Sequence, residues 1–188
     1  MRIRIASLAV ILGLALVAVV QAPAVAKPYE SGTYEYHDTF SFRDCGLRLH
    51  GDDSGYGRFA IREIRGSEGE AYLAHDNYWY TLVVTNKDNG KWMVVRGHAL
   101  FREMTGTQID GDIWEFTARE SGQPTIVEDM TGAVVMRDRG MIEFRGVFDV
   151  LGDGQPSGEL IEEEILHIAG PHPLFEGGLC GIVNELIG

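Results

Sequence analysis

Two long apolar-rich arms flank a short polar break in the middle of the chain. Residues 72–85 and 91–104 are rich in Val, Leu, Tyr, Trp and Thr, which fit the pleated surface of a sheet. Between them lies Asn-Lys-Asp-Asn-Gly at residues 86–90, and Asn and Gly tolerate the positive φ angles of tight turns. This pattern predicts a β-hairpin at the centre of an antiparallel sheet.

The remaining chain shows the same period-two alternation in shorter stretches, separated by clusters of turn-forming residues such as 51–55 and 66–70. Residues 160–169 are ambiguous, because three consecutive glutamates favour helix whereas Ile-Leu-His-Ile favours strand. We prefer the strand because its neighbours are strands. The expected strands are 33–42, 47–50, 56–65, 72–85, 91–104, 109–119, 125–128, 133–137, 141–150 and 160–169.

Eight to ten short strands joined by turns, without a helical pattern between them, are typical of an all-β sandwich or barrel. Consecutive hairpins favour a single antiparallel meander. We expect this meander to close as an up-and-down barrel like those of calycins and lipocalins, because closure removes the exposed edges. The alternative is a β-sandwich. A short C-terminal helical segment is expected at residues 179–187.

The first 26 residues have the pattern of a secretory signal peptide. Arg2 and Arg4 precede an almost unbroken apolar run at residues 6–20, and Ala-Val-Ala follows at residues 24–26 as a cleavage site. The alternative is a membrane anchor, but the run is short for a span of about 20 apolar residues. The sequence therefore predicts a signal peptide at 1–26, a flexible leader at 27–32 and one domain at 33–188, in a secreted protein.

The charge of the chain narrows the classes of partner. The formal net charge is −12, from 28 acidic and 16 basic residues. A nucleic-acid binder needs a basic face, and no cluster of Lys and Arg appears along the sequence. We therefore expect no nucleic-acid partner, and no membrane contact after cleavage of the signal. The charge favours solubility outside the cell or, alternatively, a cationic ligand or partner; the oligomeric state stays open.

The two cysteines, Cys45 and Cys180, are expected to form a disulfide. An even number of cysteines in a secreted chain indicates pairing. A redox thiol is the alternative, but the chain contains no Cys-x-x-Cys motif.

Several short motifs are spread along the chain: Cys45-Gly46, Thr85-Asn86, Asn89-Gly90-Lys91, the loop at 149–156 and Leu179-Cys180. Together they resemble those of a group of small secreted proteins from high-GC Gram-positive bacteria. The resemblance implies secretion and a paired cysteine, and it implies no activity.

The long strands each have an apolar and a polar face. Arg96 and His98 share a strand face with Trp92, and Trp79 lies on the facing arm of the hairpin. The two tryptophans are expected to be core residues or cross-strand pairs or, alternatively, to form a binding platform if they share a face. The polar faces are expected to be solvated, or alternatively to line a polar lumen. The candidate ligand-binding residues are Trp79, Trp92, Arg96, His98, Glu115 and His167.

Motifs for catalysis and for metal binding are weak. His98 and His167 are the best candidates for a general base, because histidine titrates near neutral pH. Asp149, Asp153 and Glu159 form an oxygen-rich loop that is a weak candidate for calcium. No cofactor is expected. The sequence favours a module that binds a small molecule or an extracellular partner; the alternatives are a barrel enzyme such as an isomerase or cyclase, and a structural envelope-associated protein.

Overall fold

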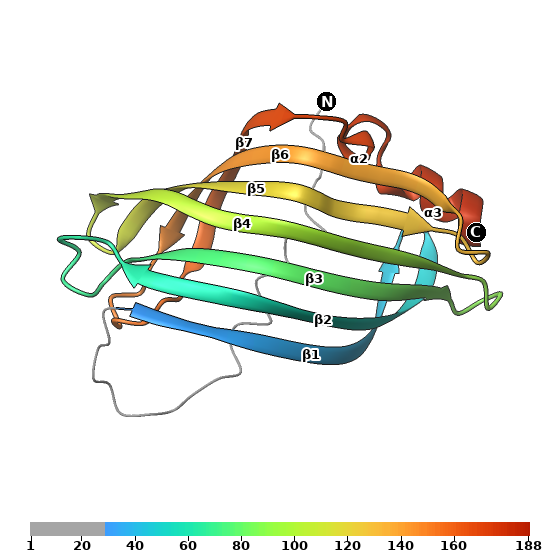
Figure 1. The fold of residues 1–188 in the computed structure, drawn as a ribbon, viewed down its shortest axis with the longest axis horizontal. Helices are drawn as coiled ribbons and strands as arrows, with labels where there is room; N and C mark the ends of the chain where they lie inside the picture. The colour runs from blue at the N-terminus through green and yellow to red at the C-terminus, as the bar shows by residue number, and fades with distance from the viewer. Residues whose placement is uncertain (1–28) are drawn as a thin grey trace.

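A computed structural model describes residues 29–188, which form one seven-stranded antiparallel sheet and two short helices (Figure 1). The strands follow one another in space as they do in sequence, so each pairs with its neighbours in the chain. The elements are β1 (Tyr29–Asp44), β2 (Leu47–Glu63), β3 (Tyr72–Asn86), β4 (Trp92–Asp110), β5 (Ile113–Glu128), β6 (Val134–Asp149), β7 (Glu159–Ala169), α2 (Pro173–Gly177) and α3 (Leu179–Ile187).

The predicted all-β meander and the short C-terminal helical segment are confirmed. Barrel closure is not supported, because β1 and β7 are the two edges of the sheet and do not pair with each other. An open sheet remains compatible with the sandwich-like alternative. The preferred strand at residues 160–169 is confirmed as β7.

Several turns that the sequence predicts lie inside strands. The cluster at residues 51–55 belongs to β2, where Gly51 pairs with Phe40 and Gly55 pairs with Tyr36. These glycines make room for rings on the neighbouring strand and do not reverse the chain. The actual strands are therefore 11 to 19 residues long and number seven, which is fewer than expected.

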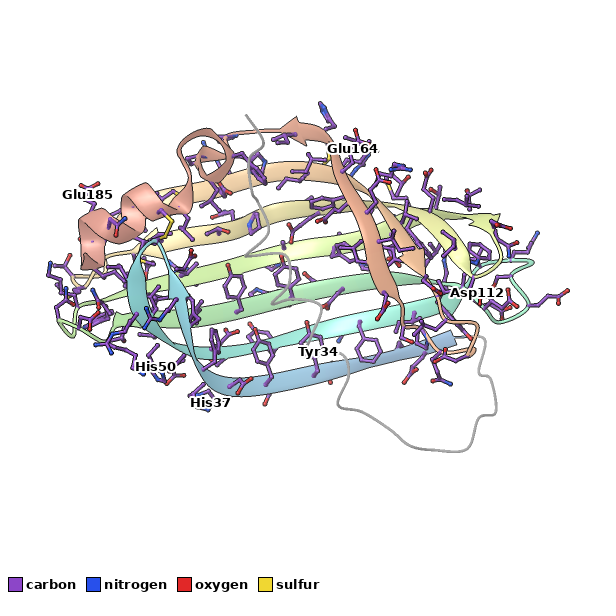
Figure 2. All side chains as sticks on the ribbon, turned by 180° about the vertical axis from the view of Figure 1, so that it is seen from behind. Tyr34, His37, His50, Asp112, Glu164 and Glu185 are labelled. Carbon is purple, nitrogen blue, oxygen red and sulfur yellow. A yellow bond between two sulfur atoms is a disulfide. The ribbon has the colours of Figure 1, made fainter. Side chains whose placement is uncertain are left out.

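The sheet is strongly curved. Three register shifts interrupt the pairing of β4 with β5, and such irregularities bend a strand and increase its twist. In Figure 2, which shows the molecule from behind, the β1–β2 hairpin and β7 lie in front of the central strands. This side of the sheet is therefore concave, and Figure 1 shows the convex side.

Two apolar clusters lie at opposite ends of the sheet. At one end α3 packs against the strands through Val183 and Ile187; the strand residues of this cluster are Leu49, Val84, Met93, Val95, Val127 and Met136. At the other end the cluster contains Ala71, Leu73, Trp114, Phe116 and Val150. The middle of the sheet lies between these clusters.

The predicted disulfide between Cys45 and Cys180 is confirmed, and it ties α3 to the β1–β2 turn (Figure 2). β1 already begins at Tyr29 and pairs with β2, so the expected leader is wrong for residues 29–32. The expected signal peptide at 1–26 lies outside the described residues. Within residues 29–188, no helix is long and apolar enough to cross a membrane.

Candidate functional site

The middle of the concave face carries a band of tyrosines and carboxylates. Strand residues alternate between faces, and Leu49 and Val84 in the α3 cluster fix which set is concave. In the middle of the same strands, the positions on this concave face carry polar side chains. We define the tyrosine–carboxylate band as Tyr34, Tyr36, Asp53, Asp76, Tyr78, Tyr80 and Glu120.

Hydroxyl groups of three tyrosines donate hydrogen bonds to carboxylates on other strands. The hydroxyl of Tyr34 lies 2.6 Å from Oδ2 of Asp76. Tyr36 donates to Oδ1 of Asp53 at 3.5 Å. Tyr78 donates to Oε1 of Glu120. Side chains from β1, β2, β3 and β5 are thus linked across the concave face.

Glycines on adjacent strands make this arrangement possible. Tyr36 pairs with Gly55, and Tyr80 pairs with Gly97, so each ring lies over a position without a side chain. A Cβ added at Gly55 would lie 2.6 Å from the ring of Tyr36. Such pairing of an aromatic ring with a glycine on the next strand is a known means of stabilising a curved sheet.

Burial changes the acidity of the band. Tyr78 is 4% exposed and Asp53 is 8% exposed. Loss of hydration raises the pKa values of Asp53, Asp76 and Glu120, although the tyrosine hydroxyls partly oppose this effect. Burial also raises the pKa of Tyr80 to about 12. The tyrosines therefore stay protonated donors, and the carboxylates accept a proton more readily than exposed ones do.

One atom of the band has no partner. Oδ1 of Asp76 is buried and accepts no hydrogen bond from any described residue. Buried polar atoms without a partner are uncommon, and they often mark the place of a water or a ligand. Asp76 thus has one buried carboxylate oxygen to which no described residue donates a hydrogen bond.

The arginines of the strands lie on one face of the sheet, whereas acidic residues lie on both. The strands contain ten arginines and no lysine. All ten lie at convex positions. Successive residues of a strand alternate between its faces, and residues next to these arginines, such as Leu49, Val95, Ala118 and Asp138, take concave positions. No arginine or lysine of the seven described strands therefore faces the tyrosine–carboxylate band. A buried basic group, His172, lies beside Asp138 and interacts electrostatically with Glu120; it is 3% exposed.

The predicted residues Trp79, Arg96 and His98 lie together on the convex face. Trp79 is sandwiched between Tyr56 and His98, with ring centroids 5.0 and 4.4 Å away and rings nearly parallel. A groove of about 620 Å³ runs beside this stack, and Arg96 lines its other side. Both faces of the Trp79 ring are covered, so the ring is not an open stacking platform.

The other candidate residues lie apart from this groove. Trp92 is near the start of β4 on the same face, opposite Thr85. Glu115 accepts a hydrogen bond of 2.6 Å from Nε of Arg145. His167 is exposed on the edge strand β7, opposite Glu143. The sequence correctly placed Arg96 and His98 on one face, but it did not bring all six residues to one site.

Of the three weak calcium candidates, Asp149 and Asp153 act as turn residues and Glu159 begins β7. Asp149 accepts a hydrogen bond from the backbone of Leu151, and Asp153 accepts one from Gln155. Across residues 29–188, the one group of ligand atoms close enough together for a metal contains Cys45 and Cys180, whose sulfur atoms form the disulfide.

Sequence reasoning missed the tyrosine–carboxylate band. The alternation of Tyr34 and Tyr36 with polar residues predicted a half-buried strand, but their carboxylate partners lie 42 and 17 residues further along the chain. The one sequence signal for the band was a repeat of glycines in β2 that faces a repeat of aromatic residues in β1. Comparison with protein-family models, with curated proteins and with solved structures gives no match to this chain.

Proposed function

We propose that the protein is a secreted binding module whose concave face holds a small organic cation. The observation that carries this proposal is the tyrosine–carboxylate band, which faces no strand arginine or lysine among the described residues. Carboxylates and aromatic rings together are the groups that recognise ammonium ions. In Figure 2 the described helices cover one end of the concave face and β7 crosses the other.

The energetics of the band support a cation as the ligand. Buried carboxylates are costly when they are ionised and unpaired. An ammonium group beside Oδ1 of Asp76 would supply the missing hydrogen bond and the missing charge. Tyr34 already holds the other oxygen of this carboxylate in place.

Secretion is part of the same proposal. The pattern of residues 1–26 favours export, and the Cys45–Cys180 disulfide is compatible with an oxidising compartment. The acidic net charge of −12 also favours attraction of cations from solution.

The experiment is calorimetric titration with a panel of organic ammonium ions, including choline and spermidine. We expect binding that strengthens as the pH rises, because burial raises the carboxylate pKa values and a cation needs the ionised form. Asp76→Asn should weaken binding about tenfold or more, since it removes the charged acceptor. The uncharged isostere of choline, 3,3-dimethyl-1-butanol, should bind far more weakly.

Asp52→Asn is the matched control, because Asp52 is exposed on the convex face and pairs with His37. It removes the same charge one residue from Asp53 in sequence but on the opposite side of the sheet. Equal losses in the two variants, equal affinity for the uncharged isostere, or no binding of any amine would each refute the proposal.

The alternative of an enzyme that uses His98 or His167 has less support. His98 stacks on Trp79 and its Nε2 lies 3.3 Å from Oδ1 of Asn77, which is an amide oxygen and not a carboxylate. A group better suited to proton transfer is Glu103, because burial raises its pKa to about 7. Turnover that is lost in Glu103→Gln but kept in His98→Ala would favour this alternative.

A further inference from the structure

The convex face contains a concentrated patch of positive charge that the linear sequence does not show. Pairing places His75 opposite Arg102, and Arg102 opposite Arg119, in one row across β3, β4 and β5. Arg58 and Arg62 project from the same face of the adjacent strand β2. We call these five exposed residues the basic patch.

Three acidic side chains of these strands point away from the basic patch, whereas Asp52 on β2 and Glu115 and Glu128 on β5 lie on the same face as the patch. Asp76, Glu103 and Glu120 take concave positions in β3, β4 and β5. At the margins, Glu35 on β1 lines the groove beside the Trp79 stack, and Glu143 on β6 accepts a hydrogen bond of 2.9 Å from Arg119.

Three arginines of the basic patch have no internal partner. Arg58, Arg62 and Arg102 form no hydrogen bond or ion pair through their side chains with any residue between 29 and 188. Arg102 moreover stands directly opposite Arg119, and like charges at such positions destabilise a sheet. The guanidinium groups of these three arginines are therefore available to bind anions, whereas that of Arg119 is paired with Glu143.

A groove with a mixed polar and apolar lining lies beside the basic patch. Its volume is about 620 Å³, and it crosses the strands between the Tyr56–Trp79–His98 stack and the row of Ser54, Thr81 and Arg96. His98, which borders the groove, precedes Arg102 by four residues along β4. In a strand this separation is about 13 Å. Hydroxyl and amide groups in such a groove match the hydroxyl groups of a sugar chain.

We propose that the convex face binds an anionic polysaccharide, with sugar units in the groove and their carboxylate or sulfate groups on the basic patch. This site is independent of the concave face. A nucleic acid fits less well, because both faces of the Trp79 ring are covered, which prevents stacking of a base on it. Arginine suits planar, bidentate recognition of carboxylate and related anions.

The test measures binding of the full mature chain to immobilised heparin and alginate at several salt concentrations. We expect affinity that falls with rising salt, no binding to neutral dextran, and a loss of about three- to tenfold for Arg102→Gln. Arg102→Gln/Arg119→Gln should lose more. These side chains are exposed, so folding should persist, and circular dichroism checks this.

The matched control is Arg43→Gln, which removes the same charge from the convex face near the β1–β2 turn, away from the basic patch. It should bind like the wild type. Equal losses in Arg43→Gln and Arg102→Gln would show attraction by general charge and refute the site. Binding of dextran, tighter binding of single-stranded DNA or of phosphatidylserine vesicles, or no binding of either polysaccharide would also refute it.

Discussion

At the scale of single residues, glycines on the concave side decide where aromatic rings lie. Gly55 has the ring of Tyr36 on one side and the backbone oxygen of Trp79 on another, at 2.6 and 2.7 Å from an added Cβ. The ring yields by rotation, but the backbone oxygen belongs to the paired strand and does not. The position of Tyr36 and its contact with Asp53 therefore depend on the absence of a side chain at Gly55.

We expect Gly55→Ala to destabilise the protein by about 1–3 kcal/mol, because an inserted methyl group forces the surrounding atoms apart. Urea denaturation measures this change. Gly181→Ala is the control, since Gly181 lies in α3 with open space around it, and alanine there should stabilise the helix by about 0.5–1 kcal/mol. Equal stability of Gly55→Ala and the wild type would contradict the proposed ring packing.

Glu103 sets a pH dependence of stability. Burial raises its pKa from 4.5 to about 7, while the backbone N–H of Ala74 donates to its Oε2 at 2.5 Å. The folded state therefore holds the proton more tightly than the unfolded state does. The contribution of Glu103 to the free energy of unfolding is fully present below pH 4.5 and falls as the pH rises toward 7. It changes little above pH 7.

Glu103→Gln should accordingly flatten the pH profile and raise the free energy of unfolding at pH 8 by up to about 3 kcal/mol. Denaturation in urea at pH 5, 6, 7 and 8 gives the comparison. Glu185→Gln, an exposed substitution on α3, should leave the profile as it is in the wild type. A Glu103→Gln profile parallel to that of the wild type would be the contrary result.

At the scale of elements, α3 is held at one end of the sheet by a covalent bond and by apolar contact. The disulfide joins Cys180 to Cys45 across 135 residues of sequence. Val183 and Ile187 are 2% and 0% exposed against the strands. The side-chain amide of Asn86 also donates to the carbonyl oxygen of Ile187 at 2.7 Å, so the β3–β4 turn fixes the end of the helix.

The double variant Cys45→Ala/Cys180→Ala should lose about 3–5 kcal/mol of stability, because the bond closes a long loop in the unfolded chain. Guanidinium denaturation measures the loss. Hydrogen exchange should show faster exchange in residues 179–187 while the β3–β4 hairpin keeps its protection. Unchanged exchange in α3 would mean that apolar contact alone fixes the helix.

At the scale of the whole molecule, the open sheet leaves two edges, and β7 protects one of them with charge. Leu160 and Ile161 are 51% and 58% exposed on this strand. Glu162, Glu163 and Glu164 follow directly, and glutamates on an edge discourage pairing with another chain. Antiparallel pairing of two β7 strands about Glu164 would bring these charges together.

We expect Glu162→Gln/Glu163→Gln/Glu164→Gln to associate as its concentration rises, as measured by sedimentation velocity. The wild type should not associate in this way as its concentration rises, because the glutamates of two β7 strands repel each other. A control with the same net charge is Glu68→Gln/Glu70→Gln/Glu185→Gln, whose positions lie off the edge strands. Association of the control to the same degree would assign the effect to net charge and not to the edge.

The sequence by itself determined the all-β class, the central hairpin, the helical C-terminal segment and the pairing of the two cysteines. These features follow from local rules: period-two alternation gives strands, Asn and Gly give the turn, and two cysteines in a chain with an export pattern give a bond. Local rules failed where glycine serves packing instead of chain reversal, as at Gly51 and Gly55, and the expected strands were consequently too short and too many.

Only the tertiary structure decided that the sheet stays open and which residues meet on its faces. Curvature and closure depend on register shifts such as the one between Arg96 and His98, which no local pattern specifies. The Tyr34–Asp76 contact and the Arg102–Arg119 pair likewise join strands through register. A one-residue change of register exchanges the two faces of a strand, so the absence of strand arginines from the concave face is a property of the assembled sheet.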